Sequence, residues 1–322
     1  MKLFLKYFVF LFLLYTVNCT LLTVGSVAEV GGVDIDVLSA KVGARPLGMG
    51  CAFTAISDNS DASYYNPAGL SFITTSELQS MQTRMSTDAD HYYISYVTPF
   101  LKGALGLSWI QISLGDITQT TTTDAFNEVI TTNIFSYFSN VYLLSYGLPL
   151  TNSFGVGLTA KYLTSDMTSV NQGQATGFSV TPGLLYKLIS DSKNIGKIGF
   201  TLEDLLNEQK WGTGTTEKSI PKLKLGIALE NLNILPEGSI FAFDLSQKIS
   251  RKYPAELSFG YEWKNNLLAL RMGWLETSSF TGGIGFSAKN NEYFTTQLDY
   301  AYVGQTSLSM ENVHRISLIG KW

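Results

Sequence analysis

Alternation between apolar and small or polar residues is the dominant pattern of the chain after residue 75. In residues 268–274, for example, Leu, Leu, Met and Trp occupy every second position. Side chains of a strand alternate between its two faces, so each apolar row marks one face of a strand. The pattern predicts about fourteen strands and no comparable helical periodicity. The expected strands are 77–85, 91–98, 103–112, 136–150, 153–164, 174–187, 197–204, 221–231, 238–248, 254–264, 266–275, 280–288, 292–303 and 313–322.

The lengths of the strands and of their links indicate a barrel. Many strands have about 10 residues, which is enough for a tilted strand to cross a bilayer. In lipid every backbone polar group needs an internal partner, which strands achieve only by closing the sheet. Short Asn-rich turns are expected at 149–153, 263–266 and 288–292, whereas 115–133 and 207–219 are expected to be longer exposed loops. We therefore expect an all-β fold, a transmembrane antiparallel β-barrel over residues 76–322. A soluble β-sandwich is the alternative.

Composition supports the membrane interpretation. Charged residues make up 15% of the chain, below the usual quarter, and the mean hydropathy is +0.12. Residues 1–28 resemble a cleaved secretory signal peptide, with Lys2 and Lys6 before an apolar run and Ser26-Val27-Ala28 before the cleavage point. A lipoprotein signal at Cys19 and a retained anchor are the alternatives. Export and a barrel together predict the outer membrane of a diderm bacterium.

Charge and cysteine usage exclude several classes of partner. Without residues 1–28 the chain keeps 20 basic and 26 acidic side chains and has no basic patch, so nucleic acid is not expected to bind. Cys51 is then the single cysteine, which leaves no internal disulfide. The expected partners are outer-membrane lipid and the barrel assembly machinery. The final strand presents Ile316, Leu318 and the terminal Trp322 on one face, the type of aromatic end that this machinery recognises.

No motif predicts catalysis or a cofactor. Residues 41–70 lack the glycine spacing of a nucleotide loop, and residues 57–63 lack the glycine of a calcium loop and are expected to be a solvated turn or helix cap. His91 and His314 lie far apart in the sequence, which argues against zinc, although an esterase would need one of them beside a serine. Glu203 and Asp204 are interpreted as a strand end. We expect no enzymatic activity, no metal and no cofactor.

The glycine- and alanine-rich stretch before the first strand is suited to a confined space. Residues 29–75 are predicted to form a compact plug of helix and turn, with Asn66-Pro67 directing the backbone into a turn. Arg45 is its strong cation, and a buried arginine there needs an acidic or carbonyl partner.

The chain resembles the PorV/PorQ proteins in residues 45–70. This family is grouped with the UPF0164 proteins inside the broader FadL-like outer-membrane group. Beyond residue 75 the resemblance lies in strand number, strand spacing and the aromatic terminus. Cys51 departs from the pattern, because the family usually has a small residue there. The motifs that carry the resemblance are Arg45-x-x-Gly48-Met49-Gly50, Ala52-Phe53-Thr54-Ala55, Asp58 and Tyr65-Asn66-Pro67-Ala68-Gly69-Leu70.

The resemblance implies a 14-stranded barrel with an N-terminal hatch in the lumen. It also implies an accessory or transport component for protein secretion and surface attachment by the type IX route, with secreted proteins as partners. The alternative is a FadL-like channel for uptake of long-chain fatty acids or other hydrophobic small molecules, through the hatch and lateral openings. A surface protein without cargo and a secreted soluble β-protein are two further possibilities.

Overall fold

The computed structural model describes residues 37–84, 89–122, 129–189, 195–232, 235–250, 253–275, 279–289, 293–304 and 313–322. The signal peptide over 1–28, lipidation of Cys19 and the first part of the predicted plug, 29–36, lie outside these residues. Within the described ranges no helix combines the length and apolarity needed to cross a membrane.

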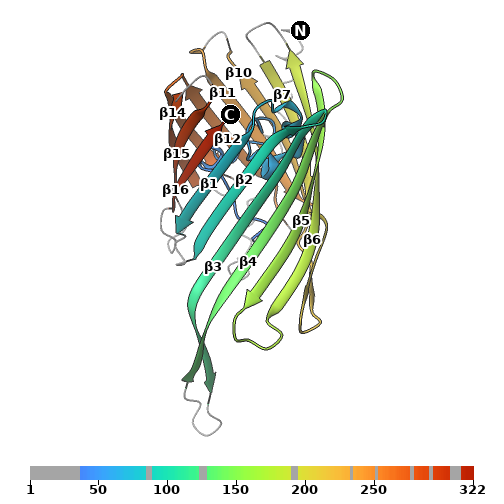
Figure 1. Ribbon diagram of the computed structural model, residues 1–322, viewed down its shortest axis with the longest axis vertical. Helices are drawn as coiled ribbons and strands as arrows, with labels where there is room; N and C mark the ends of the chain where they lie inside the picture. The colour runs from blue at the N-terminus through green and yellow to red at the C-terminus, as the bar shows by residue number, and fades with distance from the viewer. Residues whose placement is uncertain are drawn as a thin grey trace. The chain divides into compact units, whose positions relative to one another are not determined.

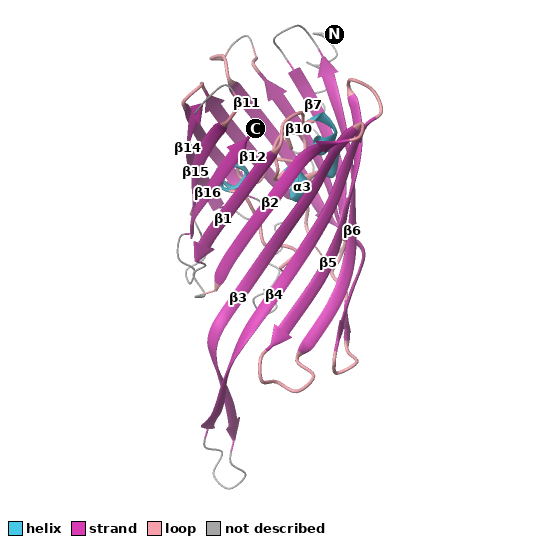
Figure 2. Ribbon diagram, viewed as in Figure 1, coloured by secondary structure: helices cyan, strands magenta, loops and turns pink. Residues whose placement is uncertain are grey.

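The strands form one closed antiparallel ring (Figures 1 and 2). Within the described residues the ring has 14 strands, β1 to β7 and β10 to β16, as predicted. β1 closes it by pairing with β16, with Glu77 opposite Lys321. The strands are β1 Glu77–Arg84, β2 Asp90–Phe100, β3 Gly103–Thr122, β4 Val129–Pro149, β5 Phe154–Met167, β6 Gln174–Ile189, β7 Ile195–Glu203, β8 Leu205–Trp211, β9 Thr216–Glu217, β10 Lys222–Glu230, β11 Ser239–Lys248, β12 Glu256–Lys264, β13 Leu268–Leu275, β14 Ser279–Lys289, β15 Thr295–Val303 and β16 Val313–Lys321.

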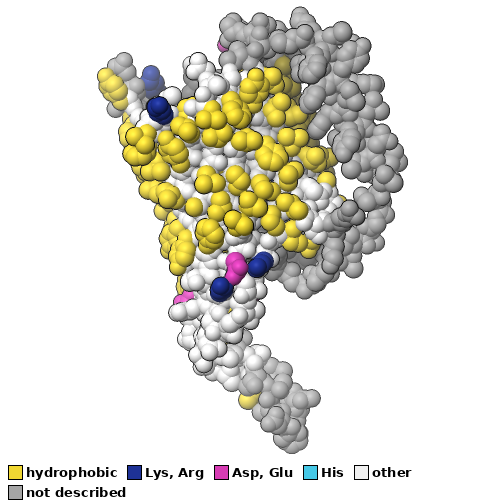
Figure 3. Space-filling model, turned by 90° about the vertical axis from the view of Figure 1, so that its right-hand side faces the viewer, with side chains coloured by type: hydrophobic (Ala, Val, Ile, Leu, Met, Phe, Trp, Pro, Cys, Tyr) yellow, Lys and Arg dark blue, Asp and Glu magenta, His cyan; other side chains and the backbone are white. Residues whose placement is uncertain are grey.

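The period-two pattern becomes an inner and an outer face. On β13, Leu270, Met272 and Trp274 face outward, whereas Arg271 and Gly273 are buried on the inner side. Figure 3 shows the outward apolar side chains as a continuous belt on one side of the barrel, with charged side chains above and below it. A belt of this kind is what a bilayer requires of a strand wall. The fold class of a membrane-spanning β-barrel is thus the one predicted.

The prediction of an exposed loop over 115–133 was largely wrong. β3 continues to Thr122 and β4 begins at Val129, so the two form a hairpin that extends beyond their neighbours (Figure 1). β2 stops pairing with β3 at Ser113, and β5 stops pairing with β4 at Tyr137. The polar composition suggested a loop, but its threonines and isoleucines are β-branched and favour strands.

The second predicted loop, 207–219, also contains strands. β8 continues along β6 after a break at Asp204, where φ is 56°, and pairs with the two-residue β9. Pro182 of β6 lies beside this break and has no backbone N–H for a strand ladder. The division of this strand into β7 and β8 thus falls between Gly183, which pairs with Thr201 of β7, and Val180, which pairs with Leu205 of β8.

The N-terminal segment, defined here as Val37–Phe72, lies inside the ring. It contains the helices α2 (Ala44–Gly48) and α3 (Ala62–Tyr65) and the 3₁₀-helix η1 (Pro67–Phe72). η1 contacts β3 to β6, and α2 contacts β13 to β16, which are strands on different sides of the ring. That this segment closes the pore as a hatch stays a prediction.

Candidate functional site

Residues 48–50, in the first half of the glycine-rich N-terminal motif, pack against glycines of the strand wall. Gly48 lies against Gly283 of β14, and a Cβ added to Gly48 would lie 3.2 Å from the Cα atom of Gly283. Gly50 has a φ of 59° and donates its N–H to the Thr281 hydroxyl at 3.0 Å. Met49 is fully buried. Backbone packs against backbone here, so the glycines set how closely segment and wall approach.

The second half of the motif packs against β5 and β6. The Asn66 side-chain amide donates to the carbonyls of Thr54 at 2.7 Å and Leu184 at 3.1 Å, and its oxygen accepts from the Ala68 N–H. Pro67 follows as the first residue of η1, a position that needs no N–H donor. A Cβ at Gly69 would lie 1.9 Å from the Ser57 carbonyl oxygen, which explains why this position requires glycine. Asn66 therefore ties the turn both to the segment and to the wall.

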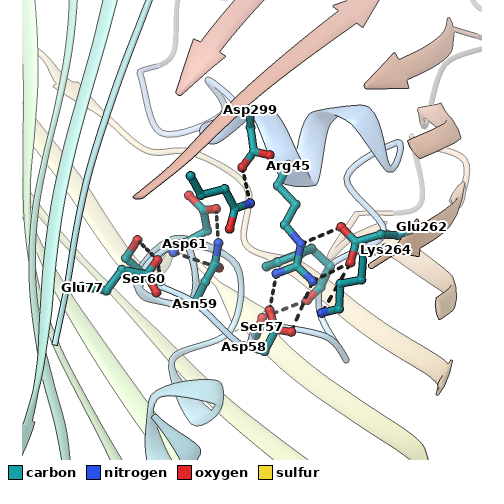
Figure 4. Close-up of polar contacts among 12 residues, drawn as sticks. Arg45, Ser57, Asp58, Asn59, Ser60, Asp61, Glu77, Glu262, Lys264 and Asp299 are labelled. Carbon is teal, nitrogen blue, oxygen red and sulfur yellow. Dashed lines mark hydrogen bonds and ion pairs between the residues drawn. The ribbon is translucent and has the colours of Figure 1, made fainter. Parts of the chain in front are cut away.

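Arg45 is held by two carboxylates, as its burial demanded (Figure 4). Its Nε and Nη2 donate to the two Glu262 oxygens at 2.8 and 2.9 Å, a bidentate pair, and its other contacts are to Asp58. Glu262 is an inward residue of β12, so the ion pair joins the segment to the wall. Bidentate arginine–carboxylate pairs are strong and directional.

The wall extends this pair into a buried network. Arg271 of β13 donates through Nε to Glu262 at 2.6 Å and through Nη1 to Asp299 of β15 at 2.7 Å. Sequence reasoning missed Glu262, Arg271 and Asp299 as site residues. The available signal was their position: each stands on the face opposite an apolar row, which places a charge in the lumen.

The acid pair at 203 and 204 is a strand end, as interpreted, but both carboxylates are engaged. Glu203 pairs with the buried Lys224 of β10 at 2.8 Å, and Asp204 pairs with the buried Lys161 of β5 at 2.8 Å. These ion pairs lie along the lumen on the side of β5, β7 and β10. Each of these lumen charges, like those of the Arg45 and Arg271 network, is compensated by an opposite charge.

The stretch 57–63 is not a solvated turn, although Asp61 stands at the N-cap position of α3, where its backbone carbonyl accepts from Tyr64 and Tyr65. Asn59, Ser60 and Asp61 are buried, and only Asp58 keeps an exposed fraction. Burial by itself raises the pKa of Asp58, but the Arg45 guanidinium outweighs it and holds that pKa well below its usual range. Burial raises the pKa of Asp61 to about 7, while the hydrogen bond from Asn59 opposes the rise. The tertiary contacts of the lumen thus give the two aspartates opposite behaviour.

Asp61 predicts a pH dependence of stability. With a folded pKa of about 7 against a usual 3.8, Asp61 keeps a proton in the folded state that the unfolded chain has released. The free energy of unfolding should therefore fall as pH rises from about 4 to about 7, by at most roughly 4 kcal/mol, and then level off. Chemical unfolding in detergent at stepped pH values measures it. Asp61→Asn should flatten the profile, and an unchanged profile in this variant would contradict the assignment.

An apolar row crosses the inner face of the wall. Tyr93 of β2, Ile110 of β3, Val141 of β4 and Leu163 of β5 are successive cross-strand partners, and all four are buried. They belong to one cluster with Val37, Leu38 and Tyr64 of the N-terminal segment. The lumens of porins are polar, so an apolar inner row covered by the segment calls for a different explanation.

The wall is irregular between β8 and β10. The β7–β10 ladder ends at Glu203 and Lys222, and β8 next pairs at Gln209 with Glu217. Between these points the Asn207 side-chain amide bonds to the backbone N–H and C=O of Ser219, at 2.9 and 3.2 Å. A groove of about 710 Å³ lies at this place, lined by residues that include Leu206, Tyr162, Phe178, Asn207, Ser219 and Pro221. This is the part of the described wall where a side chain replaces a strand ladder.

The other predicted positions are placed as follows. His91 and His314 lie on β2 and β16, the two strands that flank β1, so they are nearer than their sequence separation suggested. Among the described residues no cluster of His, Cys, Asp or Glu fits a metal.

At the C-terminal end of the chain, Ile316 and Leu318 face outward, and the Trp322 ring stacks on the rings of Phe294 and Tyr96. Recognition of this C-terminal end by the barrel assembly machinery stays a prediction. Cys51 has a φ of 58°, a conformation that favours glycine.

Several solved structures share the fold of this barrel. The Pseudomonas putida toluene transporter TodX superposes with a TM-score of 0.56 at 14% identity, covering 87% of this chain and 97% of that chain. The CymD monoaromatic hydrocarbon channel gives 0.56 at 12%, with 87% and 97% covered. A Pseudomonas aeruginosa FadL homologue gives 0.51 at 9%, with 88% and 98% covered.

Neither a family model nor a curated protein matches the sequence. At identities this low the likeness concerns the fold alone. The chain therefore has the fold of these barrels: a closed ring of 14 antiparallel strands.

Proposed function

We propose that the protein is an outer-membrane channel through which hydrophobic small molecules enter the cell, without enzymatic activity. The observation that carries this proposal is the buried inner row Tyr93, Ile110, Val141 and Leu163. A polar solute gains nothing from such a row, whereas an apolar one replaces the contacts that Leu38 and Tyr64 now make. The fold shared with a toluene transporter and a monoaromatic hydrocarbon channel supports the same substrate class.

Transport requires the N-terminal segment to shift. The segment covers the row with Val37, Leu38 and Tyr64, while its Arg45–Glu262 ion pair and the backbone contacts of residues 48–50 lie against β12 to β14. A local movement of residues 37–38 and Tyr64 would uncover the row and leave the Arg45 anchor in place. The irregular wall at Asn207 and Ser219 is the proposed lateral exit, because opening it breaks side-chain bonds rather than a strand ladder.

Uptake of a labelled hydrophobic compound tests the proposal. In a host without a comparable channel, the protein should raise the accumulation rate of radiolabelled toluene or of a radiolabelled long-chain fatty acid. Val141→Asn and Leu163→Asn should each lower this rate about tenfold or more, because an unpartnered amide in the path is costly to pass. Ile134→Asn, a matched change at an exposed position of the β3–β4 hairpin, should leave the rate unchanged. Equal accumulation with and without the protein would reject the proposal.

A PorV/PorQ-like role in protein secretion is the second candidate. The observation in its favour is the β3–β4 hairpin beyond Ser113 and Tyr137, which has a backbone edge free of β2 and β5 on each side. Free strand edges accept strands of other chains. A photo-crosslinking residue at Ile134 should then give adducts with exported proteins, while one at the lipid-facing Leu144 should not. Equal adducts at both positions would count against this role.

A further inference from the structure

Arg315 of β16 is a buried arginine without a carboxylate partner. It is 6% exposed and points inward, as do Arg45 and Arg271 from their own elements. Those two arginines are each matched by carboxylates, whereas among the described residues Arg315 forms no ion pair. An uncompensated charge in a protein interior is costly, so this position differs in kind from the rest of the lumen network.

The contacts that Arg315 does make leave its charge unneutralised. Its Nη1 donates to the Lys41 carbonyl and to Nδ1 of His91, the latter at 3.1 Å. Because a guanidinium has donors only, His91 Nδ1 must accept, and the imidazole proton is on Nε2. Arg315 Nε and His91 Nε2 are both buried and have no hydrogen-bond partner. An anion would accept hydrogen bonds from both of these free N–H donors and neutralise the positive charge of the guanidinium.

Neighbouring hydroxyl groups do not supply the missing negative charge. Cys51, Tyr64 and Tyr65 of the N-terminal segment are the titratable groups close enough to influence Arg315, and the Cys51 sulfur accepts from the Tyr65 hydroxyl at 3.5 Å. Burial raises the pKa of both phenols well above their usual value, so they stay neutral. Their O–H groups already donate to the carbonyls of Leu38 and Val42, both at 2.9 Å. Around Arg315 some donors are therefore occupied and others are free, and among the described residues no carboxylate forms an ion pair with it.

We propose that Arg315 is the centre of a binding site for a small carboxylate or other oxyanion, with His91 as the residue that positions its guanidinium. Arg315 also holds the Lys41 carbonyl, so the bound anion would lie where the wall meets the N-terminal segment. Binding would compensate the buried charge and stabilise the segment in its place. Arg315 and His91 do not belong to the apolar row that carries the proposed channel function, although Tyr64 lies near both.

Thermal unfolding of the full chain in detergent, titrated with sodium acetate at an ionic strength fixed by sodium chloride, tests the site. A ligand that binds only the folded state raises the midpoint in a saturable way. Acetate should do so for the natural chain, and Arg315→Met should weaken the apparent affinity about tenfold or more, the value of a hydrogen-bonded charge. No saturable rise in the natural chain, or an equal rise in Arg315→Met, would overturn the proposal.

Further variants keep the test decisive if Arg315→Met does not fold. His91→Gln retains a side-chain acceptor for the guanidinium but shifts its position, and it should weaken acetate binding measurably relative to the natural chain. Lys210→Met, a cation-to-apolar change at an exposed ion pair, should leave the acetate affinity unchanged. A loss of acetate binding in Lys210→Met equal to that in His91→Gln would show a general salt effect and reject the site.

The source of the anion is resolved by a second titration with octanoate. Equal affinities for acetate and octanoate indicate a free anion, and a much tighter octanoate site indicates the headgroup of an amphiphile. His91 lies opposite Ile112 in the strand register, so an apolar neighbour for such a chain is present. Acetate binding without any toluene or fatty-acid uptake would support the site while rejecting the channel, and the reverse result would do the opposite.

Discussion

Replacement of Arg45 by methionine is expected to lower the free energy of unfolding by about 3–5 kcal/mol. The change removes the bidentate partner of Glu262 and the partner of Asp58, and Glu262 is fully buried. Arg271 continues to hold one Glu262 oxygen, and the exposed Lys264 lies 3.8 Å from the other. That second oxygen and Asp58 nevertheless lose the guanidinium that hydrogen-bonds to them. Equilibrium unfolding by guanidinium chloride in detergent micelles measures the difference.

The matched control for Arg45 is Lys210→Met. Lys210 pairs with Glu208 at 3.1 Å, and both side chains are exposed, so its loss should cost less than about 1 kcal/mol. A cost at Arg45 no larger than that at Lys210 would show that the lumen pair does not hold the segment. Trypsin added to the folded variant should also cut within residues 37–72 faster than in the natural chain if the anchor is lost.

Gly273→Val is expected to displace the N-terminal segment while the strand ring still forms. A Cβ at Gly273 would lie 2.3 Å from the backbone nitrogen of Gly50 and 2.4 Å from the carbonyl carbon of Met49. Backbone atoms cannot turn away as a side chain does, so the segment must leave this part of the wall. β-branched residues suit strands, and pairing of β13 with β12 and β14 is unaffected. Protease cleavage of residues 37–72 and conductance of the reconstituted barrel should both rise.

Gly282→Val is the control for this steric argument. Gly282 is a strand glycine of the neighbouring β14 that faces outward, and the nearest heavy atom to its added Cβ is 4.0 Å away. It should leave protease resistance and conductance as they are in the natural chain. If both glycine variants behave alike, the close approach of segment and wall at Met49 and Gly50 has no functional consequence.

Strand positions were predictable because the signal is local. Leu268 to Trp274 alternate within a single strand, and lipid outside and a packed lumen inside impose that alternation on each strand separately. The β3–β4 hairpin was missed because it has no buried face beyond Ser113, so its threonines carry strand propensity without an apolar row. Alternating burial made the strand at 268–274 predictable, and the lack of such alternation led to the wrong prediction of a loop at 115–133.

The sequence by itself determined a membrane-spanning antiparallel barrel, its outward rows, and a glycine-rich N-terminal motif whose arginine needed a partner. It did not determine that partner, since Glu262 lies 217 residues from Arg45 and an inward charge can pair with any strand across the lumen. Only closure of the ring brought Arg45, Glu262, Arg271 and Asp299 together. Among the described residues closure also left Arg315 without a carboxylate, because β2 placed His91 and the N-terminal segment placed the Lys41 carbonyl beside it instead.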